Sequence, residues 1–277
     1  MKKTLLMILI LLFVIFLILL FFFKSPSKKT KIHDQPKVVP NISSIQSSGW
    51  FKLKSLTDIT VGLNDYIVIN LLADSVNQSV VGYDLVLTYD ADKLIIKEVK
   101  NLLKDFDIYK KQSIGKLMIS GVLKPTVKTK NPFQNTSLLR LEFQTVATGR
   151  ANLKIEWQKD SLKDSNLISD QSKDILGPTQ PLMINIGKKI TLIKNQPLLV
   201  EEGLKIELLD LTPPDSHCFD CLSSAKISLS KDNQKKEFTF KEGGIAGTII
   251  KEFYQFNYGF YLDKINNNGI EVIIFKK

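Results

Sequence analysis

The sequence of 277 residues has few of the residues from which enzyme active sites are usually built. Its only histidines are His33 and His217, and His33 lies in a Lys-, Ser- and Pro-rich stretch, so a Ser-His-Asp arrangement cannot be assembled convincingly. The two cysteines have no second cysteine pair beside them in the sequence to complete a four-ligand zinc site. Neither a G-x-x-x-x-G-K-[ST] phosphate loop nor an H-E-x-x-H metal motif occurs. The sequence therefore predicts no catalytic residues, cofactor or metal, and it favours a binding or structural role over an enzyme.

Arginine is also nearly absent, although the formal net charge is +10. Arg140 and Arg150 are the only arginines, and lysine lacks the planar fork that reads bases and phosphates with paired hydrogen bonds. Residues 1–40 alone carry +6 of the net charge. This distribution argues against nucleic-acid binding and indicates a basic segment next to a membrane, followed by a solvated lysine-rich surface.

The one long apolar run lies at the N-terminus, where Lys2 and Lys3 precede an uncharged stretch from Thr4 to Phe23. A helix of this length crosses the hydrocarbon core of a bilayer. A cleaved signal peptide is the alternative, but its apolar region is usually shorter and ends in small residues rather than in phenylalanines. We expect a transmembrane anchor over residues 1–23 with the rest of the chain extracytoplasmic. Lysines on both sides of the run leave the opposite orientation open.

Residues 24–49 are rich in Lys, Ser and Pro without an apolar period, which indicates a linker. From Trp50 onward the chain alternates apolar and polar residues in short stretches bounded by turn residues. These stretches are 66–74, 82–90, 93–99, 115–123, 137–147, 151–158 and 181–187. They predict a β-sandwich over residues 50–187, with one short helical turn within 99–111. Further strands predict a small β domain over residues 188–277, and Asn266–Gly269 predicts a hairpin turn.

Four segments, in the same order, resemble cohesin domains. VVGYDLVLTYDADKLIIKEV contains a corner of Tyr89, Asp90, Asp92 and Leu94 that resembles the bend after the third cohesin strand. VGLNDYIVIN precedes it, and IGKLMISGVL and LLRLEFQTVATGRANLKI follow, each similar to a cohesin segment. The resemblance covers roughly residues 50–187 and implies an all-β jelly-roll sandwich. Asp90 and Asp92 are expected to stabilise the bend rather than to bind calcium.

The cohesin resemblance implies protein recognition through one face of a sheet. Cohesins bind dockerin modules in this way, and Gly82 and Asp84 lie where the family presents polar contact residues, with Val86 on the same side of the strand. Val122 and Lys124 match a second contact region. Gly82 departs from the side-chain amide that is common at its position. The alternative for Asp84 is an ordinary exposed aspartate of a strand.

Two further functions remain open at this point. The cohesin fold is shared with carbohydrate-binding modules, and Trp50, Tyr66 and Trp157 are the candidate sugar contacts. Their spacing defines no row of aromatic rings, so core packing is the alternative role for each. A purely structural or adhesive protein of the cell envelope is the other alternative to a dockerin-like partner.

The two cysteines, Cys218 and Cys221, lie in the segment DSHCFDC. This region resembles a small β domain of exported proteins that has an acidic-Ser-Arg-Cys loop, although His217 replaces the arginine and the gap between the cysteines is shorter. A small disulfide is the first interpretation and fits an oxidising compartment. A redox pair, half of a zinc site and an inert reduced pair are the alternatives.

Overall fold

The computed structural model describes residues 48–277 except 216, 219–220 and 245–246. These residues form β-strands and a single 3₁₀ turn, Glu201–Gly203, which confirms the all-β expectation. Within this part of the chain, no helix is long and apolar enough to cross a membrane. The predicted anchor, residues 1–23, and nearly all of the predicted linker lie outside the described residues.

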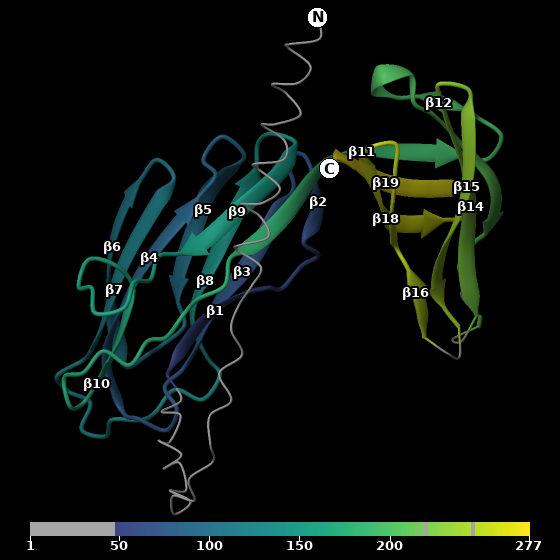
Figure 1. Ribbon diagram of the computed structural model, residues 1–277. Helices are drawn as coiled ribbons and strands as arrows, with labels where there is room; N and C mark the ends of the chain where they lie inside the picture. The colour runs from purple at the N-terminus through teal and green to yellow at the C-terminus, as the bar shows by residue number, and fades with distance from the viewer. Residues whose placement is uncertain (1–47, 216, 219–220, 245–246) are drawn as a thin grey trace, which may run out of the picture. The chain divides into compact units, whose positions relative to one another are not determined.

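The first sheet has four strands in the order β1-β3-β8-β5 (Figure 1). Their bounds are β1 Trp50–Ser55, β3 Tyr66–Asp74, β8 Thr136–Thr145 and β5 Leu94–Asn101. All neighbours are antiparallel, so alternate residues point to opposite faces. On β3, Ile67, Ile69 and Leu71 are completely buried, whereas Tyr66 on the other face is exposed. Alternating apolar residues thus direct one face of this sheet into a core.

The second sheet contains the path β11-β9-β4-β7-β6, with β10 beside β4 and β2 beside β11. The bounds are β2 Thr60–Gly62, β4 Val80–Tyr89, β6 Phe106–Ser113, β7 Lys116–Leu123, β9 Gly149–Ile155, β10 Asn166–Ser169 and β11 Leu182–Ile193. On β4, Tyr83, Leu85 and Leu87 are buried in the same hydrophobic cluster as the inner residues of β3. The two sheets therefore enclose one core, as expected of a sandwich.

The short helical turn expected within residues 99–111 is wrong. β5 continues to Asn101, and a separate strand begins at Phe106. The connection is fixed by Asn101, whose Nδ2 donates to the Phe106 carbonyl while its Oδ1 accepts from the Leu103 amide. Phe106 is buried in the core, and the register with β7 aligns the following residues. Ladder pairing and the burial of Phe106 thus override the local pattern.

The C-terminal strands enclose a second hydrophobic cluster. After Gly187, β11 no longer pairs with β9 and pairs with β19 instead. In the same sheet, β18 lies beside β19 and β17 lies beside β18. Their bounds are β17 Glu252–Gln255, β18 Tyr258–Asn266 and β19 Gly269–Lys276. A further sheet consists of β12 Leu198–Leu199, β13 Lys205–Thr212, β14 Leu222–Lys231, β15 Gln234–Gly243 and β16 Thr248–Ile250. The turn between Asn266 and Gly269 joins β18 to β19 as a hairpin.

Strand β11 serves both clusters. Ile184 and Ile186 lie in the first, and Ile190 and Leu192 lie in the second. Between them is Gly187, at which a Cβ atom would lie 2.5 Å from the Ile274 carbonyl oxygen. The domain boundary predicted near residue 187 therefore falls inside the continuous strand β11, at the point where its pairing partner changes from β9 to β19.

Candidate docking face

The residues predicted to bind a partner lie on strands β4 and β7 and the segment after β7. Residues paired across an antiparallel ladder point to the same face. The registers of β4, β7 and β6 therefore place three rows on the outer face of the second sheet. We call these nine residues the β4–β7–β6 face: Gly82, Val122 and Asp107; Asp84, Ser120 and Tyr109; Val86, Met118 and Lys111.

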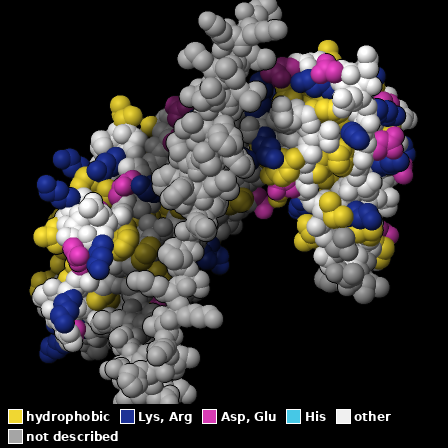
Figure 2. All heavy atoms as spheres, viewed as in Figure 1, with side chains coloured by type: hydrophobic (Ala, Val, Ile, Leu, Met, Phe, Trp, Pro, Cys, Tyr) yellow, Lys and Arg dark blue, Asp and Glu magenta, His cyan; other side chains and the backbone are white. Residues whose placement is uncertain are grey.

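Three large apolar side chains of this face are exposed together. Tyr109 is 66% exposed, Val122 is 49% exposed and Met118 is 39% exposed. Tyr109 is opposite Ser120 and is therefore the diagonal neighbour of both Val122 and Met118, which lie four residues apart on β7. In the view of Figure 2, apolar side chains lie among lysine and acidic side chains over the surface. Aromatic and methionine side chains are enriched in protein interfaces, which makes this trio a candidate contact surface.

Gly82 leaves space beside this trio. It is paired with Val122 on one side and with Ile168 of β10 on the other. A Cβ atom placed on Gly82 would have only the Gly121 carbonyl oxygen, at 3.2 Å, within 4 Å. A side chain here would press on the β7 backbone by a few tenths of an ångström, and the glycine leaves the surface lower next to Val122.

Asp84 is at the polar centre of the face. The Ser120 hydroxyl, directly opposite on β7, donates to Asp84 Oδ1 over 2.5 Å. Asn166 is its partner on β10 and is 3% exposed. Asp84 is half-buried, and no cation lies within ion-pair distance of it among the described residues. It can therefore accept a further hydrogen bond from a partner.

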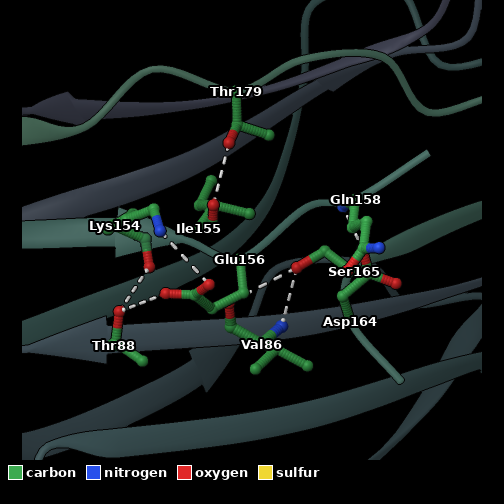
Figure 3. Close-up of polar contacts among 9 residues, drawn as sticks. All are labelled: Val86, Thr88, Lys154, Ile155, Glu156, Gln158, Asp164, Ser165 and Thr179. Atoms are coloured by element: carbon green, nitrogen blue, oxygen red, sulfur yellow. Dashed lines mark hydrogen bonds and ion pairs between the residues drawn. The ribbon is translucent and has the colours of Figure 1, made fainter. Parts of the chain in front are cut away.

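Val86 does not fit the predicted contact role. Its side chain is only 4% exposed, and the segment after β9 runs beside this part of β4 (Figure 3). The Ser165 hydroxyl accepts from the Val86 amide over 2.9 Å, and the Glu156 amide donates to the Val86 carbonyl over 2.8 Å. The alternation placed Val86 on the outer side of the strand, but in the folded chain its side chain is buried.

Glu156 forms a small charged cluster next to Val86 (Figure 3). Its carboxylate accepts from the Thr88 hydroxyl over 2.9 Å and from Lys154 Nζ over 3.3 Å. Partial burial opposes ionisation of Glu156, but these hydrogen bonds and the charges of Lys154 and Lys116 outweigh it. The pKa of Glu156 is therefore held below its ordinary value. The carboxylate links Thr88 of β4 to Lys154 of β9 next to the face.

Lys124 lies at the margin of the face, and its ammonium group already has partners within the chain. Its Nζ donates to the Lys104 carbonyl over 2.7 Å and lies 3.8 Å from Asp107 Oδ1. These contacts hold the segment after β7 against the segment before β6. A contribution of Lys124 to a partner contact remains a prediction.

The three candidate sugar contacts do not form one surface. Trp50 and Tyr66 belong to β1 and β3 of the first sheet, whereas Trp157 follows β9 of the second. Trp157 packs against the first core, and its Nε1 donates to the Leu176 carbonyl over 3.1 Å. Trp50 is opposite Asp74, at the far end of β3 from Tyr66. A planar row of these three rings is therefore ruled out by the topology.

The structure joins Cys218 to Cys221 by a disulfide with a Cα–Cα distance of 5.4 Å. Among the described residues, no group of three or more His, Cys, Asp or Glu side chains is placed to hold a metal ion. At the corner after β4, Asp90 Oδ2 accepts from the Asn152 amide, and Asp92 pairs with Lys93. Both aspartates of this corner thus have structural partners.

Comparison with known proteins adds a structural likeness. No protein-family model matches the sequence, and no curated protein matches it. The solved structures that are similar include a cohesin from Clostridium acetobutylicum, with 18% identity over 50% of this chain and 90% of that one, at a TM-score of 0.41. A cohesin module of a Clostridium perfringens family 33 glycoside hydrolase has 11% identity over 51% of this chain and 99% of that one, at a TM-score of 0.41.

A third similar structure is the sixth cohesin of scaffoldin B from Acetivibrio cellulolyticus, solved in complex with a dockerin. It has 16% identity over 50% of this chain and 99% of that one, at a TM-score of 0.40. All three are cohesin modules, the family that the segments between residues 50 and 187 resemble. About half of this chain is therefore similar to cohesin modules.

Tyr109 and Met118 are the residues of the face that the sequence did not reveal. Tyr109 fell in the stretch expected to contain a helical turn, so its place in a strand was missed. Met118 was part of an expected strand, but alternation alone does not say which strands lie beside it. Only Phe106 and Ile108, on either side of Asp107, gave a local signal for this strand, and that signal ends before Tyr109.

Proposed function

We propose that this chain is a membrane-anchored, extracytoplasmic binding protein whose cohesin-like jelly-roll domain holds a protein partner at the cell envelope. The partner class is a dockerin-like module, and the contact surface is the β4–β7–β6 face. The observation that carries the proposal is the exposed trio of Tyr109, Met118 and Val122 beside the half-buried Asp84. Apolar anchors around an oriented polar group are typical of protein recognition surfaces.

Two features support the extracytoplasmic, membrane-anchored location in this proposal. The uncharged run from Thr4 to Phe23 has the length of a membrane span, and a bond between Cys218 and Cys221 suits an oxidising environment. In that arrangement the basic linker separates the binding domain from the membrane. Protease accessibility of the strand region in intact cells tests this topology directly.

The docking proposal is tested with the full chain, purified in mild detergent and immobilised, against a panel of dockerin modules. We expect saturable binding to at least one module. Asp84→Lys should weaken it by about tenfold or more, because the change removes a hydrogen-bonded carboxylate and inserts a cation at the centre of the face. Tyr109→Ala should weaken it through the loss of an exposed aromatic contact.

The matched control is Asp92→Lys, which makes the same charge change at the exposed corner after β4. It should bind like the unchanged chain. Circular dichroism of each variant separates lost binding from lost folding. Equal weakening by Asp84→Lys and Asp92→Lys, or absence of binding to the whole panel by a folded chain, would contradict the proposal.

A further inference from the structure

The opposite sheet of the sandwich carries a row of cations on its outer face. The register of β1, β3, β8 and β5 aligns Lys54, Asn70, Arg140 and Lys100 as direct cross-strand neighbours. Leu53, Leu71 and Leu139, next to them along the strands, point into the core, so this row points outward. Neighbouring strands are about 4.8 Å apart, and the row therefore spans roughly 15 Å. We call these four residues the cationic row.

None of the three cations of this row has an acid directly opposite it in the register. Lys54, Arg140 and Lys100 are exposed, and none of them forms an ion pair among the described residues. The nearest acids in the register, Glu142 and Glu98, occupy the next outward row. Like charges placed directly opposite in a sheet are destabilising, so a bound anion would relieve the repulsion between Arg140 and Lys100, which Glu142 and Glu98 oppose only from the next row.

Asn70 adds a second, independent sign of a ligand. Its side chain is in the middle of the cationic row and is 8% exposed, yet its Oδ1 has no hydrogen-bond partner among the described residues. A buried acceptor without a donor is costly. The Oδ1 atom is covered by its surroundings, so a ligand hydroxyl would reach it between Lys54 and Arg140 only after a neighbouring side chain had moved.

A groove continues from the row toward the start of β1. It has a volume of about 620 Å³ and is lined by Trp50, Lys52, Lys54, Leu72, Asn135 and Gln180, among others. Trp50, Lys52 and Lys54 alternate with the buried Phe51 and Leu53, so they share the outer face. The groove thus combines an aromatic ring, two ammonium groups and two amides.

We infer that the cationic row and this groove form a binding site for an acidic polysaccharide. Carboxylate or sulfate groups of the sugar chain pair with Arg140, Lys54 and Lys100, and Arg140 supplies the planar fork suited to such groups. Hydroxyl groups reach the groove amides, and the Trp50 ring lies at the end where a sugar ring can stack. The site is on the sheet opposite the β4–β7–β6 face, so it does not depend on the docking proposal.

The test measures binding of the full chain, in mild detergent, to polygalacturonate, dextran sulfate and uncharged dextran at two salt concentrations. We expect binding to at least one acidic polymer, none to dextran, and weakening at the higher salt concentration. Arg140→Gln should weaken binding by about tenfold, because a charge-assisted paired contact is lost. Lys54→Gln should weaken it in the same direction.

Lys264→Gln is the matched control, because Lys264 is an exposed strand lysine without an ion pair among the described residues. It should leave polysaccharide binding unchanged. Equal losses in Lys264→Gln and Arg140→Gln, or equal competition by duplex DNA, would reduce the site to a non-specific positive surface and overturn the inference. Absence of binding to both acidic polymers would also overturn it. Asp84→Lys should retain polysaccharide binding, which keeps the outcome separate from the docking test.

Discussion

At the scale of single residues, charge placement beside the docking surface depends on Glu156. Its carboxylate accepts from Thr88 and Lys154, and the Lys116 charge adds to the same effect. The pKa of Glu156 is lower in the folded chain than its ordinary value of 4.5. A carboxyl group with a depressed pKa stabilises the fold at pH values above its unfolded pKa and loses this contribution as pH falls through its folded pKa.

A pH-dependent stability difference between the unchanged chain and Glu156→Gln should therefore appear. The unchanged chain should be the more stable of the two above about pH 5, and the difference should shrink as pH falls below 4.5. Urea denaturation between pH 3 and pH 7 measures this. Glu98→Gln is the control, because Glu98 forms no side-chain hydrogen bond or ion pair among the described residues. A difference between unchanged chain and Glu156→Gln that stayed constant down to pH 3 would contradict the prediction.

At the scale of elements, the pairing of β4 with β7 decides the shape of the docking surface. Tyr83 on β4 is directly opposite Gly121 on β7, on the inner side of the sheet. The Tyr83 ring covers the glycine and contacts Phe51 and Phe106, with ring centroids 6.4 Å and 6.0 Å away. The missing side chain at Gly121 lets the ring lie flat, and the outward neighbours Ser120 and Val122 keep their register.

Gly121→Ala should destabilise the fold. Its Cβ atom would be 2.1 Å from Tyr83 Cε1, and a buried ring among other rings cannot move aside freely. Overpacking of this kind costs about 1–3 kcal/mol. Thermal unfolding followed by circular dichroism measures the loss. Gly82→Ala, on the outer side of the same strand pair, should change stability by much less, and equal losses in the two variants would refute the packing argument.

The strands themselves were largely predictable, because alternation with β-branched and aromatic residues is a local signal. β3, β4, β7 and β8 lie within a few residues of the expected stretches. β6 was not predicted, because its exposed end, Lys110–Ser113, carries few apolar residues. The strand is held by its ladder with β7 and by the burial of Phe106, and both are contacts with distant parts of the chain.

At the scale of the whole molecule, two hydrophobic clusters are joined through β11. Both tryptophans of the chain, Trp50 and Trp157, are in the part of the chain that encloses the first cluster. The second cluster is built around rings such as Phe260, which is completely buried and stacks on Phe253 with centroids 4.8 Å apart. Tryptophan fluorescence therefore reports on the first cluster and circular dichroism reports on both.

Phe260→Ala should lower the stability of the second cluster by about 3–5 kcal/mol. If each cluster unfolds as its own unit, the circular-dichroism transition broadens or splits, and the fluorescence midpoint stays where it was. Urea titrations with both probes test this. A parallel shift of both midpoints would show that the strands around both clusters unfold as one unit, and that residues 50–187 are not a separate domain.

The sequence by itself determined the all-β class, the places of most strands, which face of each strand is apolar, and the cohesin resemblance. Only the tertiary structure decided that Val86 is covered, that Tyr109 and Met118 lie beside Asp84, and that Lys54, Asn70, Arg140 and Lys100 form one row. The physical reason is that alternation is set by the geometry of one strand. Neighbours across strands depend on pairing and register between segments far apart in the chain, which burial of the whole core selects.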